Sequence, residues 1–357
     1  MKRGTSATKG IMQAGNIPVI SGGRQPAFYC NASNRTGEVI TVAGSGAGAG
    51  YVQYWNEPIF VCDAFSIQGN ETLNTKYVYY VLTSIQEKIY STKKGGGVPH
   101  VHISSIDKFE IPVPPLPVQE EIVRVLDAFT ELQAELQAEL QKRKQQYNFY
   151  RDNLLNFKNI NRGGQEIKWM KLKEIGKVCM CKRILKEQTE SSGDVPFFKI
   201  GTFGGVADAY IPQELFDSYK SKFSYPQKGD ILISAAGTIG RTVEFDGKPA
   251  YFQDSNIVWL KHDERLVLNS YLRYCYTQNP WAISTGGTIS RLYNDNILNA
   301  TIPVPPIAEQ NRIVAILDRF DALTNDLTSG LPAEMEKRRQ QYEYYRDKLL
   351  TFKRKEA

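Results

Sequence analysis

The sequence predicts an α+β protein in which two sheet-rich globular domains are joined by two long antiparallel helices that form a coiled coil. Two repeated blocks predict this arrangement. KRKQQYNFYRDNLLNFK at Lys142–Lys158 returns as KRRQQYEYYRDKLLTFK at Lys337–Lys353, identical at 12 of 17 positions. IPVPPLPVQEEIVRVLDAF at Ile111–Phe129 returns as IPVPPIAEQNRIVAILDRF at Ile302–Phe320. The stretches between the blocks agree only faintly, so the tandem repeat is pseudo-two-fold, with variable domains on constant helices.

The repeat also sets the expected domain boundaries, and 357 residues suit two or three domains. We expect a first globular domain over 1–114, a first coiled-coil helix over 115–158 and a linker over 159–167. We expect a second globular domain over 168–305 and a second coiled-coil helix over 306–354.

Composition narrows the class of protein. The net charge of +6 suits a polyanionic partner, although such a charge is common in other proteins. Five cysteines, an odd number, indicate no disulfide framework and a reducing compartment. No apolar run approaches the roughly 20 residues that span a bilayer, and MKRGTSATKG is not followed by a signal-peptide core. We therefore expect a soluble, cytoplasmic protein that has no membrane partner.

The helices are predicted from apolar positions at alternating steps of four and three, which is a heptad seam. The second copy has four extra residues between its two blocks. Such an insertion is either a stutter in the coiled coil or, because Gly330 and Pro332 lie there, a helix break; we expect a kink near Pro332. The predicted seam consists of Ile122, Leu126, Phe129, Leu136, Leu140, Tyr147, Tyr150 and Leu154, with Ile313, Leu317, Phe320, Leu327, Tyr342, Tyr345 and Leu349.

Each helix follows IPVPP, whose prolines fix φ and remove amide donors, so we expect a stiff extended lead-in. The short linker after the first helix then requires the second helix to run antiparallel to the first. A helix of about 40 residues is roughly 60 Å long, which would hold the two globular domains apart.

The globular domains are predicted from strand-like alternation broken by glycine turns, over Gly37–Trp55 and Gly229–Phe252. In the second domain, Trp169, Leu172 and Ile175 resemble a first core strand. Nothing similar precedes Gly15, so the first domain apparently lacks its first strand, through a late start codon or a natural shortening. We expect the first domain to be the less stable one.

No catalytic or metal-binding pattern stands out. The glycine run Gly44–Gly50 leads into a strand, so it favours a turn over a phosphate-binding loop. Two histidines flank Val101, and the Cys179–Cys181 pair has no second pair, so we expect no metal site. There is no Gly-x-Ser-x-Gly, no Walker loop and no Asn-Pro-Pro-aromatic signature. The chain is predicted to be non-catalytic.

Two different globular domains on a fixed spacer suit the reading of two short DNA sites at a set distance, because base contacts must vary with the target and the spacer need not. The twice-repeated IPVPP with QEEIVRVLD or QNRIVAILD, the KRKQQYNFYRDNLLNFK-type helix end and the LxEIG opening at Leu172–Gly176 resemble the specificity subunit of type I restriction-modification systems. The resemblance covers nearly the whole chain. The shortened opening of the first domain departs from the family pattern.

The resemblance implies two target-recognition domains, each reading one half of a bipartite double-stranded DNA sequence in the major groove. It also implies that the helices dock methyltransferase subunits, which use S-adenosylmethionine, and that restriction subunits, which hydrolyse ATP, join them. This chain itself is expected to bind no cofactor and no metal. Pseudo-symmetry predicts two methyltransferase copies.

Candidate DNA-binding residues lie mainly in STKKGGGVPHVH and STGGTISRLYND, two glycine-containing turns with hydrogen-bond donors at equivalent places. A solvated surface turn remains the alternative interpretation. The candidates are Arg24, Gln25, Lys93, Lys94, His100 and His102 in the first domain, and Arg241, Thr288, Ser290, Arg291 and Tyr293 in the second.

Equal helix faces would bind equal subunits. The partner-docking candidates are Gln145, Gln146, Arg151, Asp152, Gln340, Gln341, Arg346 and Asp347. Two other functions stay open: a coiled-coil scaffold whose globular domains bind peptides, and a methyltransferase fused to specificity domains. Salt separates the scaffold from the DNA reader, because binding to phosphates weakens log-linearly with salt.

Overall fold

The computed structural model describes residues 1–157, 167–282 and 291–353. The chain divides into two compact units: unit 1 comprises Met1–Glu139 with Leu331–Ala357, and unit 2 comprises Leu140–Gly330. Among the described residues no helix is both long and apolar enough to cross a membrane.

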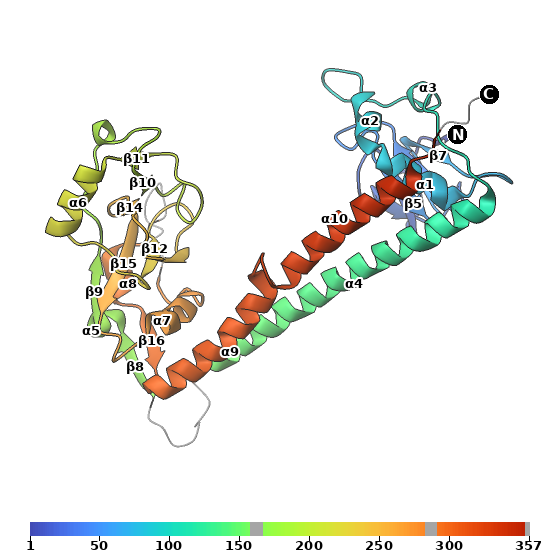
Figure 1. The fold of residues 1–357 in the computed structure, drawn as a ribbon. Helices are drawn as coiled ribbons and strands as arrows, with labels where there is room; N and C mark the ends of the chain where they lie inside the picture. Colours follow the sequence, from blue (N-terminus) through green and yellow to red (C-terminus); the bar gives the residue numbers. More distant parts are fainter. Residues whose placement is uncertain (158–166, 283–290, 354–357) are drawn as a thin grey trace. The chain divides into compact units, whose positions relative to one another are not determined.

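Unit 1 contains two small sheets. The first is antiparallel, in the order β1-β7-β4-β5, and α1 packs on it through Ile40, Val42, Tyr77 and Val81 (Figure 1). The second has the order β3-β2-β6, with β2 and β6 parallel. The strands are β1 (Lys2–Arg3), β2 (Ile17–Ile20), β3 (Phe28–Cys30), β4 (Val39–Ala43), β5 (Val52–Trp55), β6 (Phe60–Val61) and β7 (Ala64–Ile67); the helices are α1 (Thr75–Ser84), α2 (Gln86–Ser91) and α3 (Ile103–Ile106).

Unit 2 repeats this topology and adds to it. Its sheets have the orders β13-β12-β15-β9 and β11-β10-β14, which match the two sheets of unit 1, and a further pair, β16-β8. The strands are β8 (Lys168–Lys171), β9 (Gly176–Cys179), β10 (Val195–Phe198), β11 (Tyr210–Ile211), β12 (Ile231–Ser234), β13 (Thr242–Glu244), β14 (Tyr251–Phe252), β15 (Ile257–His262) and β16 (Thr301–Val304); the helices are α5 (Leu172–Ile175), η1 (Lys186–Gln188), α6 (Gln213–Lys222), α7 (Asn269–Tyr276) and α8 (Asn294–Leu298).

The opening of each unit corrects one expectation. In unit 1, β1 pairs with β7 as β9 pairs with β15, so the edge strand that the sequence appeared to lack is partly present. In the part of unit 1 that the structure describes, β8 and α5 have no counterpart. The expected first core strand of the second domain is also wrong. Trp169 on β8 is 45% exposed, whereas Leu172 and Ile175 are buried on the short helix α5.

The long helices are α4 (Leu116–Leu155), α9 (Ile307–Asn325) and α10 (Leu331–Leu350). Both α4 and α9 begin directly after the paired prolines of IPVPP, because proline is tolerated where an amide lacks an intrahelical acceptor. Figure 1 shows α4 as one helix, whereas the second repeat is divided into α9 and α10. A break, and not a kink near Pro332, accommodates the four extra residues.

The break removes one residue from the predicted seam. The carboxylate of Asp326 accepts hydrogen bonds from the amide and hydroxyl of Thr328 at 2.7 and 2.6 Å, which closes a turn after α9. Leu327 lies in this turn and is 79% exposed, so its assignment to the seam is wrong. The apolar period alone could not distinguish a continued helix from this turn.

The remaining helix contacts are antiparallel within each unit. In unit 1, Phe129 of α4 stacks on Tyr345 of α10, and Ile122 and Leu126 share a core cluster with Leu349. In unit 2, Tyr150 of α4 stacks on Phe320 of α9, and Leu154 shares a core cluster with Ile313 and Leu317. Leu140 is buried, Leu136 and Tyr147 are half-buried, and Tyr342 meets Phe129 edge to face.

Candidate nucleic-acid interface

Three equivalent segments meet in each unit. They are the end of a central strand (β4 or β12), the turn before the neighbouring strand in the sheet (β7 or β15), and the segment before a short helix (α3 or α8). In unit 1, Gly44 after β4 donates to Asp63 O (3.0 Å) and accepts from Val101 N (2.9 Å). In unit 2, Ala235 after β12 donates to Asn256 O (2.7 Å) and accepts from Leu292 N (2.9 Å). One backbone framework therefore presents different side chains in the two units.

Cleft 1 is the cavity of unit 1 at this meeting point, with about 260 Å³ of free volume. Its polar lining is Arg3, Asp63, His100, His102 and Ser104. The hydroxyl of Ser45 donates to the Asp63 carboxylate, and the two imidazole rings lie parallel with centroids 6.3 Å apart. Cleft 1 thus combines one carboxylate acceptor and one arginine donor with histidine and serine side chains that can both donate and accept.

The end of the predicted turn of unit 1, His100 to His102, lines cleft 1. Lys94 and His100 exchange two backbone hydrogen bonds (2.9 and 2.8 Å), which close the loop between them. His100 and His102 therefore share one face, as predicted, but His102 is the residue before α3 and not part of a strand. The Lys93 ammonium lies 4.1 Å from the centroid of the Tyr90 ring, whereas Lys94 is exposed.

Arg24 and Gln25 lie on the exposed turn between β2 and β3. This turn is held against the cleft framework at Gly22, where a Cβ atom would stand 2.1 Å from the carbonyl oxygen of Ser45. Only glycine permits that approach. The Arg24 guanidinium lies 5.0 Å from the centroid of the Tyr51 ring, close to the hairpin that the glycine run forms between β4 and β5.

Cleft 2 is a cavity of unit 2 that adjoins the framework at Ser255 and Asn256, with about 480 Å³ of free volume. Its polar lining is Arg183, Lys186, Thr189, Lys199, Gln253, Asp254, Ser255 and Asn256. Arg183 pairs with Asp254 at 2.9 Å, and Lys199 pairs with Asp208 at 2.8 Å. Cleft 2 is nevertheless more cationic than cleft 1, because Arg183, Lys186 and Lys199 line cleft 2 and only Arg3 lines cleft 1.

One predicted residue of unit 2, Arg291, contacts the lining of cleft 2, and Tyr293 lies near Arg291. Arg291 Nη2 donates to the carbonyl oxygen of Ser255 at 2.8 Å, where the Ser255 backbone has the left-handed φ of 55°. Tyr293, 56% exposed, precedes α8, and the Arg291 guanidinium lies 6.0 Å from the centroid of its ring. Thr288 and Ser290 lie outside the described residues.

Sequence reasoning missed most of the cleft 2 lining. Arg241, a predicted site residue, donates instead to Gly204 O at 3.1 Å, at the turn between β12 and β13. The missed residues were Arg183, Lys186, Lys199, Gln253 and Asn256. The polar QDSN turn after a strand and the basic CKRILK segment after β9 were the available signals.

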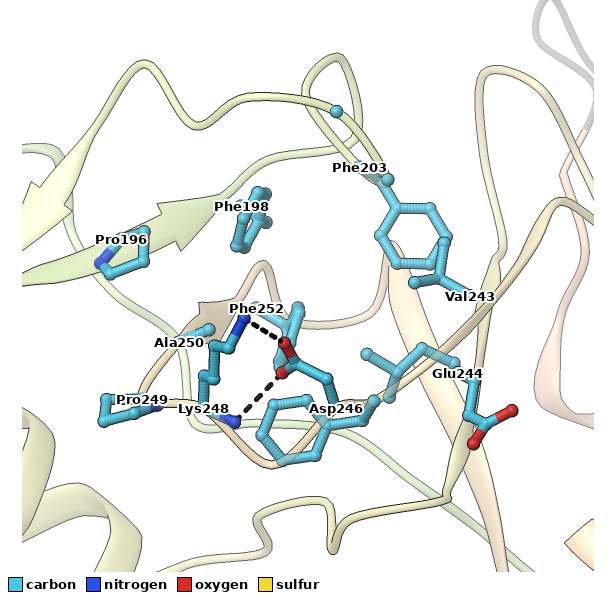
Figure 2. Close-up of a pocket in the computed structure, with 14 residues that line it drawn as sticks. Pro196, Phe198, Phe203, Val243, Glu244, Asp246, Lys248, Pro249, Ala250 and Phe252 are labelled. Atoms are coloured by element: carbon cyan, nitrogen blue, oxygen red, sulfur yellow. Dashed lines mark hydrogen bonds and ion pairs between the residues drawn. The ribbon is translucent and has the colours of Figure 1, made fainter. Parts of the chain in front are cut away.

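A further cavity of unit 2 has a different character. The rings of Phe198, Phe203 and Phe252 line a space of about 410 Å³. Figure 2 draws them with the other lining residues. Lys248 is the one cation among its lining residues, and it pairs with Asp246 at 3.3 Å. An apolar cavity with a paired lysine is poorly suited to phosphate, so the two clefts remain the better candidate interface.

The repeated helix ends present equivalent faces. The Arg151 guanidinium lies 5.7 Å from the centroid of Tyr147, and that of Arg346 lies 5.8 Å from the centroid of Tyr342, so both arginines fold back on their helices. Of the predicted docking residues, Gln145, Asp152, Gln340, Gln341 and Asp347 are exposed and Gln146 is half-buried. Sequence reasoning missed Phe149 and Tyr344, equivalent aromatic residues that are 64% and 61% exposed.

Comparisons with known proteins agree with this organisation. Residues 2–143 and 165–337 match the family described as type I restriction modification DNA specificity domain. A putative type I restriction enzyme specificity subunit of Haemophilus influenzae is 47% identical over 95% of this chain and 89% of its own length. The EcoR124I/EcoR124II specificity subunit of Escherichia coli is 34% identical over 82% of this chain and 74% of its own length. The crystal structure of the S subunit from M. genitalium has the same fold, with a TM-score of 0.60, 17% identity and coverage of 99% of this chain and 94% of that chain.

Proposed function

This chain belongs to the type I restriction-modification DNA specificity family, and we propose that cleft 1 and cleft 2 each read one half of a bipartite DNA target. The observation that carries the proposal is that the two units share one backbone framework but place different side chains around it. Gly44 and Ala235 make the same backbone bonds in the two units, while the residues around them differ. Sequence-specific reading requires that difference, because only base contacts vary with the target.

The side chains in the clefts suit base edges in the major groove. Arginine and lysine pair with guanine, asparagine and glutamine with adenine, and a carboxylate accepts from the cytosine amino group. Cleft 2 offers Arg183, Gln253 and Asn256 for such contacts, and cleft 1 offers Asp63 and His100. The chain would act without catalysing a reaction itself, as the DNA-recognition subunit of a larger complex.

The proposal extends to partners. The helix ends would dock methyltransferase subunits, and the equivalent faces at Phe149 and Tyr344 support two copies per chain. Restriction subunits would join that core. Methyl transfer with S-adenosylmethionine and hydrolysis of ATP would belong to these partners, and the complex would act on DNA in the cytoplasm.

The alternative of a coiled-coil scaffold is disfavoured, since two curated relatives at 47% and 34% identity are both named specificity subunits. The alternative of a fused methyltransferase is disfavoured for the same reason. DNA recognition is the function that the fold and the relatives support together.

The proposal is tested by mapping methylated bases in cells that express the chain with its methyltransferase partner. We expect a two-part motif with a fixed gap that is absent without the chain. Asn256→Ala should relax the bases of one half only, and His100→Ala those of the other half, each by about 1–3 kcal/mol per lost base contact. Lys248→Ala, which removes a charge away from cleft 2, is the control. No motif in the wild type, or the same relaxation in all three variants, would refute the assignment.

A further inference from the structure

A fully buried glutamine joins the recognition part of unit 1, meaning its sheets and short helices without the long helices, to the start of α4. We call this connection the joint of unit 1. Gln119 has 0% exposure. Its Oε1 accepts from Asn74 N (2.9 Å), and its Nε2 donates to Thr72 O (2.9 Å) and Pro114 O (2.7 Å). One side chain therefore ties α4 to the proline lead-in and to the backbone that starts α1.

Unit 2 repeats this joint bond for bond. Gln310 on α9 also has 0% exposure. Its Oε1 accepts from Leu268 N (2.9 Å), and its Nε2 donates to Leu266 O (3.0 Å) and Pro305 O (2.8 Å). The surrounding sequences, NETLNTKY and ERLVLNSY, differ at most positions, yet the amide makes the same three bonds.

Two tyrosines on α1 and α7 complete each joint. Tyr77 and Tyr271 donate to the lead-in carbonyls of Pro112 (3.0 Å) and Pro303 (3.1 Å). One turn further along these helices, Tyr80 donates to Asp127 of α4, and Tyr274 donates to Asp318 of α9, both at 2.5 Å.

The joints are built to resist rotation. Burial, with the hydrogen bond to Asp127, raises the pKa of Tyr80, so its hydroxyl remains a donor at neutral pH. A buried amide that loses its partners leaves three backbone groups unsatisfied, which is costly in a low-dielectric interior. Any rotation of the recognition part about its helix would break several of these bonds at once.

We infer that Gln119 and Gln310 are positioning residues that fix the angle of each recognition part on its helix and so fix the number of base pairs between the two half-sites. The inference rests on the proposed function. One added base pair moves a half-site by about 3.4 Å and rotates it by about 35°, so a rigid joint rejects targets whose gap differs by one. A loosened joint would accept them while the bases read in each half stayed the same.

The test uses the full chain with its methyltransferase partner and maps the methylated motif. Gln310→Met keeps the side-chain volume and removes all three hydrogen bonds. Gln310→Glu keeps an acceptor for Leu268 N and loses both donors. Val258→Ala, in the core of unit 2 but away from the joint, is the matched control for a loss of stability.

We expect Gln310→Met to methylate the same half-sites and to raise methylation at gaps one base pair longer or shorter by about tenfold, equivalent to about 1.4 kcal/mol. Gln310→Glu should give a rise at least as large, because its buried carboxylate would face the carbonyl oxygens of Leu266 and Pro305, and Val258→Ala should keep the single gap. If Gln310→Met does not fold, Gln119→Met in unit 1 provides the same comparison. A single unchanged gap in the folded glutamine variants overturns the inference and leaves the proposed function standing. A wild type with no two-part motif overturns both.

Discussion

Phe129 stacks on Tyr345, with ring centroids 5.5 Å apart and planes 25° apart. Its repeat counterpart Phe320 stacks on Tyr150 at 5.3 Å and 24°. These residues occupy equivalent positions in the two copies of the sequence. The same antiparallel helix contact is therefore made once in each unit.

The stack should contribute to stability. Phe129→Ala removes an aromatic pair worth about 0.5–1.5 kcal/mol beyond its buried area, so we expect a loss of about 2 kcal/mol in the free energy of unfolding. Urea denaturation measures it. Phe149→Ala, at a residue that is 64% exposed, is the control and should change stability by less than about 0.5 kcal/mol. An equal loss in both variants would contradict the assigned contact.

Because the second repeat is broken between α9 and α10, the substitution Leu→Asp should be disruptive at Leu126 and nearly neutral at Leu327. Leu126→Asp places a carboxylate at a position with 0% exposure and should prevent unit 1 from folding. Leu327→Asp alters a leucine that is 79% exposed and should be neutral within about 0.5 kcal/mol. Circular dichroism and limited proteolysis distinguish the two. Unfolding of the Leu327→Asp variant would mean that the helix continues through the turn.

The hydrogen bond between Tyr274 and Asp318 should be worth about 1.5 kcal/mol, at the low end for a charged acceptor, because Asp318 also pairs with Arg273 at 2.7 Å. Tyr274→Phe deletes the hydroxyl, and with it also the hydrogen bond that Arg273 Nη2 donates to that oxygen at 2.8 Å. Tyr80→Phe should cost a similar amount in unit 1. Tyr29→Phe, at a tyrosine that is 55% exposed, is the control. Chemical denaturation measures the loss in the free energy of unfolding. A loss for Tyr29→Phe as large as for the other two variants would contradict the stabilising role of these hydrogen bonds.

Binding of DNA should weaken with salt. Each phosphate contact contributes about 0.9 to the slope of log affinity against log salt. Lys186 lies in a highly exposed part of cleft 2, so Lys186→Ala should reduce that slope by about one if the ammonium meets a phosphate. Fluorescence anisotropy with a DNA duplex across a salt series measures the slope. An unchanged slope with altered base preference would assign Lys186 to base reading instead.

The cysteines should differ in reactivity. Burial raises the pKa of the Cys275 and Cys181 thiols to about 12, whereas Cys62 is only partly buried. Thiolate is the reactive form, so alkylation at about pH 8.5 should modify Cys62 long before the other two. Mass spectrometry after an iodoacetamide pulse measures it, with all cysteines expected to react in concentrated urea. Rapid labelling of Cys275 in the native protein would contradict its burial.

The same shifts carry a stability consequence with a definite sign. Since folding raises the pKa of both thiols, their neutral form is favoured in the folded state. Their contribution is therefore fully present below their ordinary pKa of about 8.5 and is lost as the pH rises towards 12.

The repeat, the long helices and the two-domain plan could be predicted from the sequence, because they depend on local periodicity and on proline lead-ins. Ile122 and Leu126 follow the heptad period and are buried, as are Ile313 and Leu317. Where a short insertion interrupted the period at Leu327, the local pattern no longer decided between helix and turn.

The clefts could be predicted only in part. His100 and Arg291 were found because each follows a stretch of sequence that combines glycines with several hydrogen-bond donors. Arg183 and Asn256 were not, because they are far from Arg291 in the sequence and only the pairing of β12 with β15 brings Asn256 to the framework. Long-range strand pairing leaves no local signal in a chain.

The sequence by itself determined the family, the tandem symmetry and the helices, since these depend on repeated blocks and on the periodic spacing of apolar residues. Tertiary structure alone decided what the buried Gln119 and Gln310 do. Two of the three partners of each glutamine are backbone groups 42 to 47 residues away in the sequence. Almost every residue carries such backbone groups, so no residue pattern marks them as partners. The side chains that define each cleft and the bonds that orient it therefore emerged only once the chain was folded.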